Sequence, residues 1–163
     1  MLVYDEFRSP QGPMVIAATA KGVAGVYFKG QKHFPETRDW RRDPRHPALR
    51  QAKRELQEYF ARRRRRFTVP VDPAGTPFQR AVWKAIAKVR FGGTLTYGEL
   101  ARRAGHPGSA RAAGAATGRN PLGILVPCHR IVGADGSLTG YAGGLARKRA
   151  LLALERRTSR AAS

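Results

Sequence analysis

The second half of the chain opens with a helix-start signal that fixes where its first helix can lie. Thr76 is a good N-cap, Pro77 suits the first helical position, and Gln79 can return a hydrogen bond to the cap, which completes a capping box. This signal predicts a helix that ends near Phe91. Its core-facing residues follow at helical spacing and are Phe78, Ala81, Val82, Ala85, Ile86 and Val89.

A second capping box further along begins a pair of short helices. Thr96 and Glu99 start a helix that runs through Ala104, and Ser109 is placed to cap another helix over residues 110–118. Glycines and a proline separate the two helices. Two short helices joined by a glycine turn predict a helix-turn-helix, a motif by which many proteins bind DNA.

The predicted recognition helix is unusual because nearly all its side chains are small. Arg111, at its front, is the single long side chain. A helix that reads bases in the major groove normally presents several long polar side chains. Small residues instead permit close approach to a narrow groove, with Arg111 taking the space of a displaced base, although tight helix packing explains them equally well. They are Ala110, Ala112, Ala113, Gly114, Ala115 and Ala116.

The first half of the chain alternates short apolar runs with turn residues. Residues 3–7, 14–17 and 23–28 predict a meander of three antiparallel strands. The polar residues 29–46 indicate a loop, and a helix is expected over residues 46–64. One apolar stripe marks the buried face of that helix and consists of Leu49, Ala52, Leu56 and Phe60.

A run of arginines at residues 62–66 follows. Cations are favoured at a helix C-terminus, so a solvated helix end explains the run, and a phosphate contact is the alternative. Residues 67–69 predict a short strand, and the proline- and glycine-rich stretch after them predicts a linker. We therefore expect an α+β chain with an N-terminal domain over residues 1–72 and a C-terminal domain over residues 73–163.

Charge narrows the class of partner. The 163 residues carry 31 Lys and Arg against 11 Asp and Glu, a net charge of +20. Such a field attracts polyanions, of which nucleic acid is the usual one, although an anionic membrane surface would meet the same charge. No apolar run is long enough to span a bilayer, and the N-terminus lacks the layout of a signal peptide. We expect a cytoplasmic protein without a membrane partner.

The single cysteine lies between two short apolar runs, Ile124–Val126 and Ile131–Val132. Because Cys128 is alone, neither a disulfide nor a cysteine-based metal cluster accounts for it. A thiol beside an imidazole is a candidate nucleophile, since a nearby base raises the thiolate fraction and only the thiolate attacks. A buried structural cysteine is the alternative, but the polar pair His129-Arg130 would be costly to bury without partners.

One carboxylate in the second half is a candidate partner for that imidazole. On a final helix over about residues 145–157, Glu155 falls on the same inward face as Leu151 and Leu152. A carboxylate packed inside so basic a region needs a partner, and His129 is the candidate.

The segment Pro127-Cys128-His129-Arg130 resembles the active site of the O6-alkylguanine-DNA alkyltransferases, also called methylated-DNA–protein-cysteine methyltransferases. The resemblance covers about Gly75 to Glu155 in family order and spacing, whereas residues 1–72 fit only in general layout. It implies a ribonuclease H-like N-terminal domain and a winged-helix-like C-terminal domain. The further motifs that carry it are Thr76-Pro77-Phe78-Gln79-Arg80-Ala81-Val82-Trp83, Thr96-Tyr97-Gly98-Glu99-Leu100-Ala101, Ala110-Arg111-Ala112-Ala113-Gly114, Gly118-Arg119-Asn120-Pro121 and Leu138-Thr139-Gly140-Tyr141-Ala142-Gly143-Gly144.

The resemblance implies DNA repair by direct alkyl transfer. The target guanine is flipped out of duplex DNA, and its O6 alkyl group passes irreversibly, once per protein molecule, to Cys128. His129 would act as base through a bound water, with Glu155 orienting the imidazole, as in a catalytic triad. Tyr97 would donate a hydrogen bond or proton to the guanine ring, and Asn120 would brace the cysteine loop.

The resemblance also implies how the DNA is held. The helix-turn-helix would dock in the minor groove, with Arg111 replacing the flipped nucleotide in the stack. The pocket for the base would be formed at Tyr97, Cys128, Ile131, Tyr141 and Ala142. The other residues expected at the DNA are Thr96, Ala110, Ala112, Ala113, Gly114, Arg119 and Arg130.

The expected partner is double-stranded DNA with alkylated bases, bound by a monomer that could also cluster cooperatively along the duplex. O4-alkylthymine is left open as a further substrate. No cofactor and no metal are expected, because the structural zinc of some relatives uses cysteines that this chain lacks. The alternative is a lesion-binding or regulatory helix-turn-helix protein without transfer, which leaves the segment around Cys128 without a purpose.

Overall fold

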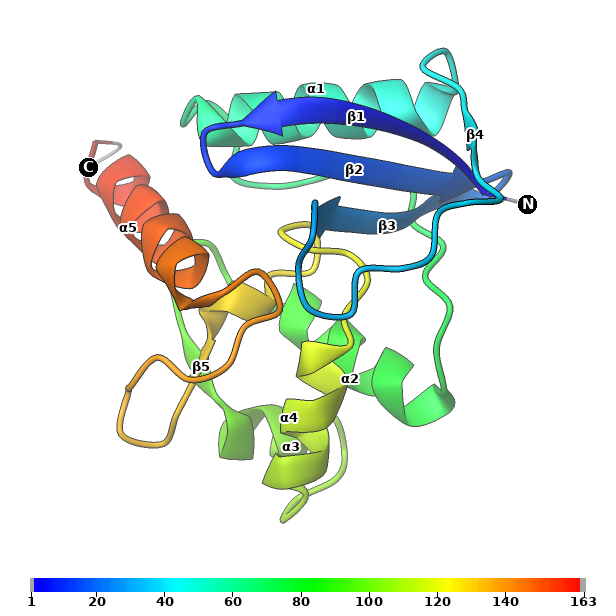
Figure 1. Cartoon of the computed structure of the whole chain (residues 1–163). Coiled ribbons are helices and arrows are strands. Elements are labelled where there is room, and N and C mark those ends of the chain that lie inside the picture. The colour runs from blue at the N-terminus through cyan, green and yellow to red at the C-terminus, as the bar shows by residue number, and fades with distance from the viewer. Residues whose placement is uncertain (1, 162–163) are drawn as a thin grey trace.

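The computed structural model describes residues 2–161, with side chains described for residues 2–159, and its N-terminal half is built on a sheet (Figure 1). The predicted meander is confirmed, since β1 pairs antiparallel with β2 and β2 with β3. A fourth strand, β4, adds to the free edge of β1 in parallel, inside the segment expected to be a loop. Two exposed arginines form β4, so no alternating apolar pattern marks it in the sequence. The strands are β1 (Val3–Ser9), β2 (Gly12–Thr19), β3 (Gly22–Phe28) and β4 (Arg41–Arg42).

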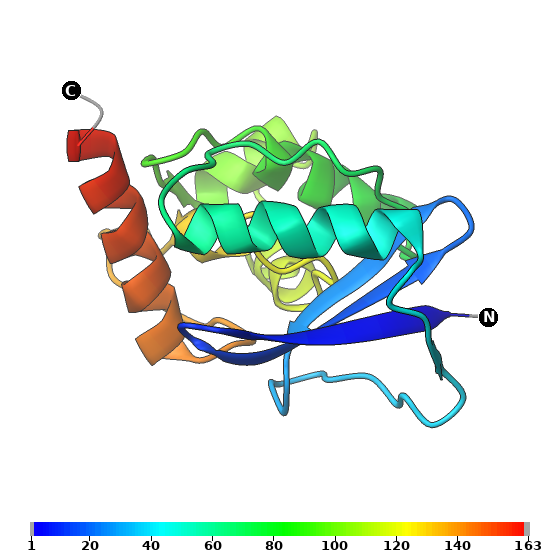
Figure 2. The same ribbon diagram turned by 90° about the horizontal axis from the view of Figure 1, so that it is seen from above.

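Helix α1 (Pro47–Phe60) packs across the sheet and ends earlier than predicted (Figures 1 and 2). The arginine run therefore lies after the helix rather than on its last turn. The cause is a Schellman-type end, in which Arg62 adopts a left-handed φ of 62° and the Arg63 amide donates to the Glu58 carbonyl at 2.9 Å.

The buried face of α1 differs from the predicted stripe at its last position. Leu49, Ala52 and Leu56 are fully buried, as expected. The fourth fully buried hydrophobic side chain of α1 is Tyr59, whereas Phe60 is only partly buried. This shift by one residue turns a tyrosine hydroxyl inward, and a buried hydroxyl needs a hydrogen-bond partner.

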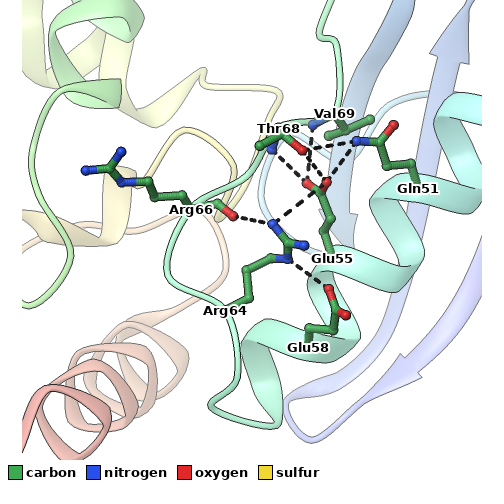
Figure 3. A network of polar contacts seen from close by, with 7 residues as sticks. All are labelled: Gln51, Glu55, Glu58, Arg64, Arg66, Thr68 and Val69. Carbon is green, nitrogen blue, oxygen red and sulfur yellow. Dashed lines mark hydrogen bonds and ion pairs between the residues drawn. The ribbon is translucent and has the colours of Figure 1, made fainter. Parts of the chain in front are cut away.

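The segment expected to form a strand at residues 67–69 has no strand partner and is held by a side chain instead. Glu55 on α1 accepts hydrogen bonds from the Thr68 amide at 2.9 Å, the Val69 amide at 3.3 Å and the Thr68 hydroxyl at 2.8 Å (Figure 3). The backbone pairing occurs just afterwards, where Val23 on β3 forms a parallel bridge with Val71.

Helices dominate the second half, and both predicted capping boxes are confirmed by reciprocal hydrogen bonds at Thr76 and Thr96. The first helix ends at Ala87 rather than near Phe91. The helix predicted over residues 110–118 is confirmed with Ser109 at its N-cap position, but Ser109 makes no side-chain capping bond, so that part of the prediction is wrong. The elements are α2 (Pro77–Ala87), β5 (Leu95–Thr96), α3 (Tyr97–Arg103), α4 (Ala110–Gly118), a 3₁₀ turn (Cys128–Arg130), β6 (Ile131–Val132) and α5 (Leu145–Ala161).

The two halves of the chain share one hydrophobic core, which runs from residues of β2 and α1 to residues of α2, α3 and α5. Backbone bonds join them as well, because the Val26 amide of β3 donates to the Pro121 carbonyl at 2.8 Å and the Gly123 amide to the Val26 carbonyl at 3.1 Å. The segment that leads to Cys128 is thus anchored on the edge of the N-terminal sheet. Within residues 2–161, no helix is both long and apolar enough to cross a membrane.

Candidate active site

Cys128 begins a 3₁₀ turn at the end of a tightly held loop. The loop is braced by Asn120, which donates from Nδ2 to the Val126 carbonyl at 2.9 Å and accepts the Leu122 amide on Oδ1 at 3.0 Å. The turn itself closes with the Arg130 amide donating to the Pro127 carbonyl at 2.9 Å. Because the side chain of Asn120 is buried and fixes both ends of the preceding bend, the position of Cys128 is set by the loop.

A cavity of about 390 Å³, which we call the acceptor pocket, opens beside Cys128. The structure brings together there six residues expected at the base or the DNA, namely Tyr97, Gly114, Arg119, Cys128, Tyr141 and Ala142. They come from the start of α3, from α4 and the residue after it, from the 3₁₀ turn and from the glycine-rich loop before α5. A volume of this size is in the range of small-ligand pockets.

The N-terminal half supplies part of the wall of the acceptor pocket, which sequence reasoning missed. Lys32 and His33, from the segment between β3 and β4, line it, and the Lys32 amide donates to the Ala142 carbonyl at 3.0 Å. His33 has a left-handed φ of 61°. No local pattern marks these two residues, because their role depends on which surface the loop meets.

Several residues expected at the base or the DNA lie elsewhere. Ile131 is fully buried outside the acceptor pocket, and its carbonyl already accepts Lys148 Nζ at 2.5 Å. Ala113 is fully buried and packs in the core, so its side chain cannot touch DNA, and that prediction is wrong. Thr96 is half-buried and its hydroxyl donates to Glu99 within the capping box.

The remaining residues of α4 differ in exposure. Arg111 and Ala112 are exposed at the front of the helix, whereas Ala110 is half-buried. Trp83 of α2 donates from Nε1 to the Ala116 carbonyl at 2.8 Å and fixes the opposite face. The small residues of α4 therefore fit both tight helix packing and close approach to DNA, because some of them pack in the core and others are exposed.

Arg130 corrects another expectation. It was predicted to contact DNA, but only 5% of it is exposed and its guanidinium is occupied. Its Nε and Nη2 donate to the two carboxylate oxygens of Glu155 at 2.8 and 3.0 Å, and its Nη1 donates to the Val89 carbonyl at 2.7 Å. A two-pronged contact of this kind is strong because both donors are charged.

Glu155 joins this arginine to the histidine beside the cysteine, as the sequence predicted for His129. His129 Nε2 lies 2.6 Å from Glu155 Oε2, and both side chains are buried. The Tyr59 hydroxyl of α1 donates to the same oxygen at 2.6 Å. Burial alone would raise the pKa of Glu155, but the hydrogen bonds from His129 and Arg130 and the charge of Arg130 outweigh it and lower the pKa to about 2. Glu155 is therefore an anion.

His129 is the neutral partner in this contact. Burial lowers the pKa of His129, and the charges of Arg130 and Lys148 oppose its protonation further, so the Glu155 contact does not compensate. With the Nε2 hydrogen directed to Glu155, the other ring nitrogen, Nδ1, is an acceptor. Nδ1 is buried and makes no hydrogen bond with any described residue. It is the one atom of this network left to accept a proton.

Cys128 is a thiol at rest, and a buried lysine lies in its surroundings. Burial raises the pKa of Cys128, and Asn120 and Lys148 only partly offset that effect. Lys148 Nζ is itself enclosed and donates to the carbonyls of Ile131 at 2.5 Å, Thr139 at 2.6 Å and Gly140 at 3.2 Å, while burial lowers its pKa to about 8. Attack by Cys128 therefore requires a base to remove its proton.

Among the described residues, no group of three or more His, Cys, Asp or Glu is placed to hold a metal ion. The chemistry available is that of a buried thiol, a neutral imidazole held by an anionic carboxylate, and a tyrosine facing the same pocket. This combination suits nucleophilic attack on a group delivered into the acceptor pocket.

Comparison with known proteins covers both halves of the chain. Residues 2–73 match the ribonuclease-like domain of 6-O-methylguanine DNA methyltransferase, and residues 77–157 match the DNA binding domain of the same family. The chain is 44% identical to the methylated-DNA–protein-cysteine methyltransferase of Mycobacterium tuberculosis over 96% of its own length and 93% of the relative. The enzyme of the same name from Methanosarcina acetivorans is 44% identical over 94% of this chain and 98% of the relative.

Solved structures agree. The M. tuberculosis protein in complex with DNA superimposes with a TM-score of 0.89 at 43% identity, covering 96% of this chain and 94% of that one. The structure of the M. tuberculosis O6-methylguanine methyltransferase gives the same TM-score, 0.89, at 44% identity over 97% of this chain and 94% of that one. The chain therefore belongs to the 6-O-methylguanine DNA methyltransferase family.

Proposed function

We propose that this protein repairs alkylated DNA by moving the alkyl group of O6-alkylguanine onto its own Cys128, once per molecule. The observation that carries the proposal is the arrangement of Cys128 in the wall of the acceptor pocket, next to a neutral His129 that Glu155 holds by one ring nitrogen. Membership of the 6-O-methylguanine DNA methyltransferase family supports the same reaction.

The first step is activation of the thiol. His129 Nδ1 takes the proton of Cys128 through a bound water, and Glu155 stabilises the imidazolium that forms. Because Arg130 and Tyr59 hold Glu155 as well, the carboxylate cannot rotate away from the ring. The positive charge of Lys148 stabilises the developing thiolate, since it opposes the rise in the pKa of Cys128.

The second step is the displacement. A bond forms between Cys128 Sγ and the alkyl carbon as the bond between that carbon and O6 breaks, and the electron pair moves into the guanine. Tyr97, which lines the same pocket, donates a hydrogen bond or proton to the ring and makes the base a better leaving group. The product is a thioether, which no group in the pocket can cleave, so the protein is consumed.

Delivery of the base is the part of the proposal that uses α4. A guanine inside a duplex cannot reach Cys128, so the nucleotide has to leave the stack. The exposed Arg111 and Ala112 at the front of α4 suit approach through the minor groove, with Arg111 replacing the flipped nucleotide. Arg119, at the pocket mouth, is placed to meet a phosphate of the flipped residue.

The organisation of the molecule follows from the same proposal. We assign residues 1–72 and 73–163 to two domains that fold around one shared core, and we place the protein in the cytoplasm as a monomer that needs no cofactor. The N-terminal domain contributes Tyr59 to Glu155 and two residues to the pocket wall, so the second domain does not hold the complete site.

The test is a titration against duplex DNA that carries O6-methylguanine with a labelled methyl group. Label should saturate at one methyl per protein on the peptide containing Cys128. Binding without label would contradict the proposed function and favour a lesion-binding or regulatory protein. Cys128→Ala is the matched control, because it should abolish transfer and leave DNA binding largely intact.

A further inference from the structure

A second cavity, larger than the acceptor pocket, borders the cysteine loop. It has a volume of about 560 Å³, against about 390 Å³ for the acceptor pocket, and shares no lining residue with it. Leu125, Pro127 and Arg130 contribute one wall, and the remaining walls come from the segment after α1 and from the end of α2 with the turn that follows it. Nothing in the alkyl transfer uses this cavity.

The charge of its lining is of one sign. Five cationic side chains line the cavity and no carboxylate does. Arg130 is already neutralised by Glu155, but the other four form no ion pair within the part of the chain that the structure describes. They are Arg65, Arg66, Lys88 and Arg90. We call this site the arginine cavity.

The arginine run after α1 divides at this point. Arg64 is turned toward α1, where its Nε donates to Glu58 at 2.9 Å and its Nη1 lies 4.0 Å from Glu55. Figure 3 shows the side chain of Arg66 pointing away from both carboxylates. The run is therefore not a uniform solvated charge, because one arginine is neutralised by the fold and the next two line a cavity.

The remaining walls favour phosphate over a base. The Phe91 ring has the Arg65 guanidinium 5.3 Å from its centroid and the Arg130 guanidinium 5.5 Å away, so it is already in contact with two cations. A stacking base would have to compete with them. Arginine forks, in contrast, match phosphate oxygens with two parallel hydrogen bonds.

We propose that the arginine cavity binds phosphate groups of a DNA strand, as a contact additional to that of the helix-turn-helix. Unneutralised cations gathered in a concave site repel one another, and a phosphate relieves that repulsion. The cavity is open to solvent through exposed Arg66, Lys88 and Arg90, so a polymer can enter it as well as a free anion. The inference rests on the proposed function only in taking DNA as the partner.

The test compares two double variants that remove equal charge. Arg66→Gln/Arg90→Gln removes exposed cations of the cavity, and Arg50→Gln/Arg54→Gln removes exposed cations on α1 that line neither cavity. The affinity for undamaged duplex DNA is measured over a range of salt concentrations. If each arginine contacts one phosphate, the plot of log K against log salt concentration should become less steep by about 1.8 in the cavity variant. The affinity of that variant should fall on the order of tenfold, whereas the control variant should keep the slope of the parent protein.

Equal slopes for the two variants would overturn the proposal. Titration with inorganic pyrophosphate distinguishes a DNA phosphate from a free phosphate compound. If the parent protein binds pyrophosphate saturably, the cavity variant does not, and the salt slope of DNA binding is the same in both, the assignment to DNA is overturned. Methyl transfer at saturating DNA should be unchanged in both variants. If the parent protein failed to transfer the methyl group, the proposed function would be contradicted, but the salt dependence of DNA binding would be unaffected. Failure of the proposed function and failure of the phosphate site can therefore be told apart.

Discussion

Each half of this protein contains a buried glutamate with several hydrogen bonds, and the proposed reaction uses only one of the two. Glu55 on α1 and Glu155 on α5 are both almost fully buried, and each accepts at least three hydrogen bonds. Hydrogen bonds lower the pKa of both carboxyls against the opposing effect of burial. Burial and a lowered pKa therefore do not by themselves mark a functional residue.

The difference lies in the partners. Glu55 is satisfied by Gln51, by Thr68 and by the Val69 amide, and these donors have no further function once they are bonded (Figure 3). Glu155 holds one nitrogen of an imidazole whose other nitrogen has no partner among the described residues. A buried carboxylate becomes part of a mechanism when a group that it fixes keeps a free acceptor next to a nucleophile.

The largest effect should come from replacing each carboxylate by its amide. Glu155→Gln removes the anion that stabilises the protonated His129, so the rate of methyl transfer should fall on the order of 100-fold or more. It should also destabilise the fold by about 3–5 kcal/mol, because Arg130 is left buried without its counter-charge. Single-turnover transfer and thermal unfolding measure the two effects separately.

Glu55→Gln is the matched variant. It should reduce stability by about 1–3 kcal/mol through weaker bonds to the segment after α1, while the transfer rate of the folded protein stays within about twofold of the parent. A rate loss in Glu55→Gln as large as that in Glu155→Gln would show that the two carboxylates do not differ as proposed.

Only one of these glutamates could be picked out from the sequence. Glu155 could be, because it sits on the inward face of a regular helix in a region with few acids, and the motif around Cys128 offered a partner. Glu55 could not, since its partners lie in an irregular segment that no periodicity describes. Helices with capping boxes were predicted to within a few residues for a similar reason, because their signals are local.

Predictions from the sequence were wrong where the position of a side chain depends on a tertiary contact. The resemblance placed Arg130 at the DNA, and no local pattern indicated its actual partner Glu155, which is 25 residues away in the sequence. Tyr59 was overlooked because its partner is 96 residues away, on the other half of the chain. The contact forms because the buried face of α1 includes Tyr59 instead of the predicted Phe60. The spacing of apolar residues alone does not distinguish two neighbouring positions on a helix.

Tyr59 gives a prediction of intermediate size. Tyr59→Phe removes the hydroxyl that donates to Glu155 but keeps the buried ring. The transfer rate should fall about threefold to tenfold, which is part of the roughly 1.5–3 kcal/mol that a hydrogen bond to a charged group contributes, because His129 and Arg130 still hold the carboxylate. Rapid-mixing transfer kinetics at saturating DNA would measure it.

The control for Tyr59 is Thr68→Val, which removes a hydroxyl bond to Glu55 in the same way. This variant should lose about 1 kcal/mol of stability and no transfer rate. If Tyr59→Phe lowered the stability but left the transfer rate unchanged, the contact between α1 and Glu155 would be structural. The functional difference between the two glutamates would then rest on the contact of Glu155 with His129 alone.

The smallest expected effect is the response to pH, which distinguishes His129 from Glu155, the two partners of one hydrogen bond. The pKa of His129 lies below its ordinary value of 6.5, so most of the histidine is still neutral at pH 6.5 and the transfer rate there should stay close to that at pH 7.5. An unshifted pKa would lower the rate at pH 6.5 by a factor of about 1.8 relative to pH 7.5.

Stability should respond at lower pH. The pKa of Glu155 is about 2 in the folded protein against 4.5 without the fold, so its stabilising contribution is complete above pH 4.5 and is lost as the pH falls toward 2. The difference in melting temperature between the parent and Glu155→Gln should therefore shrink over that interval, because a protonated carboxyl resembles the amide. A difference that stayed constant from neutral pH to pH 2 would mean that Glu155 is not held as an anion, and the stabilisation of a protonated His129 would then need another source.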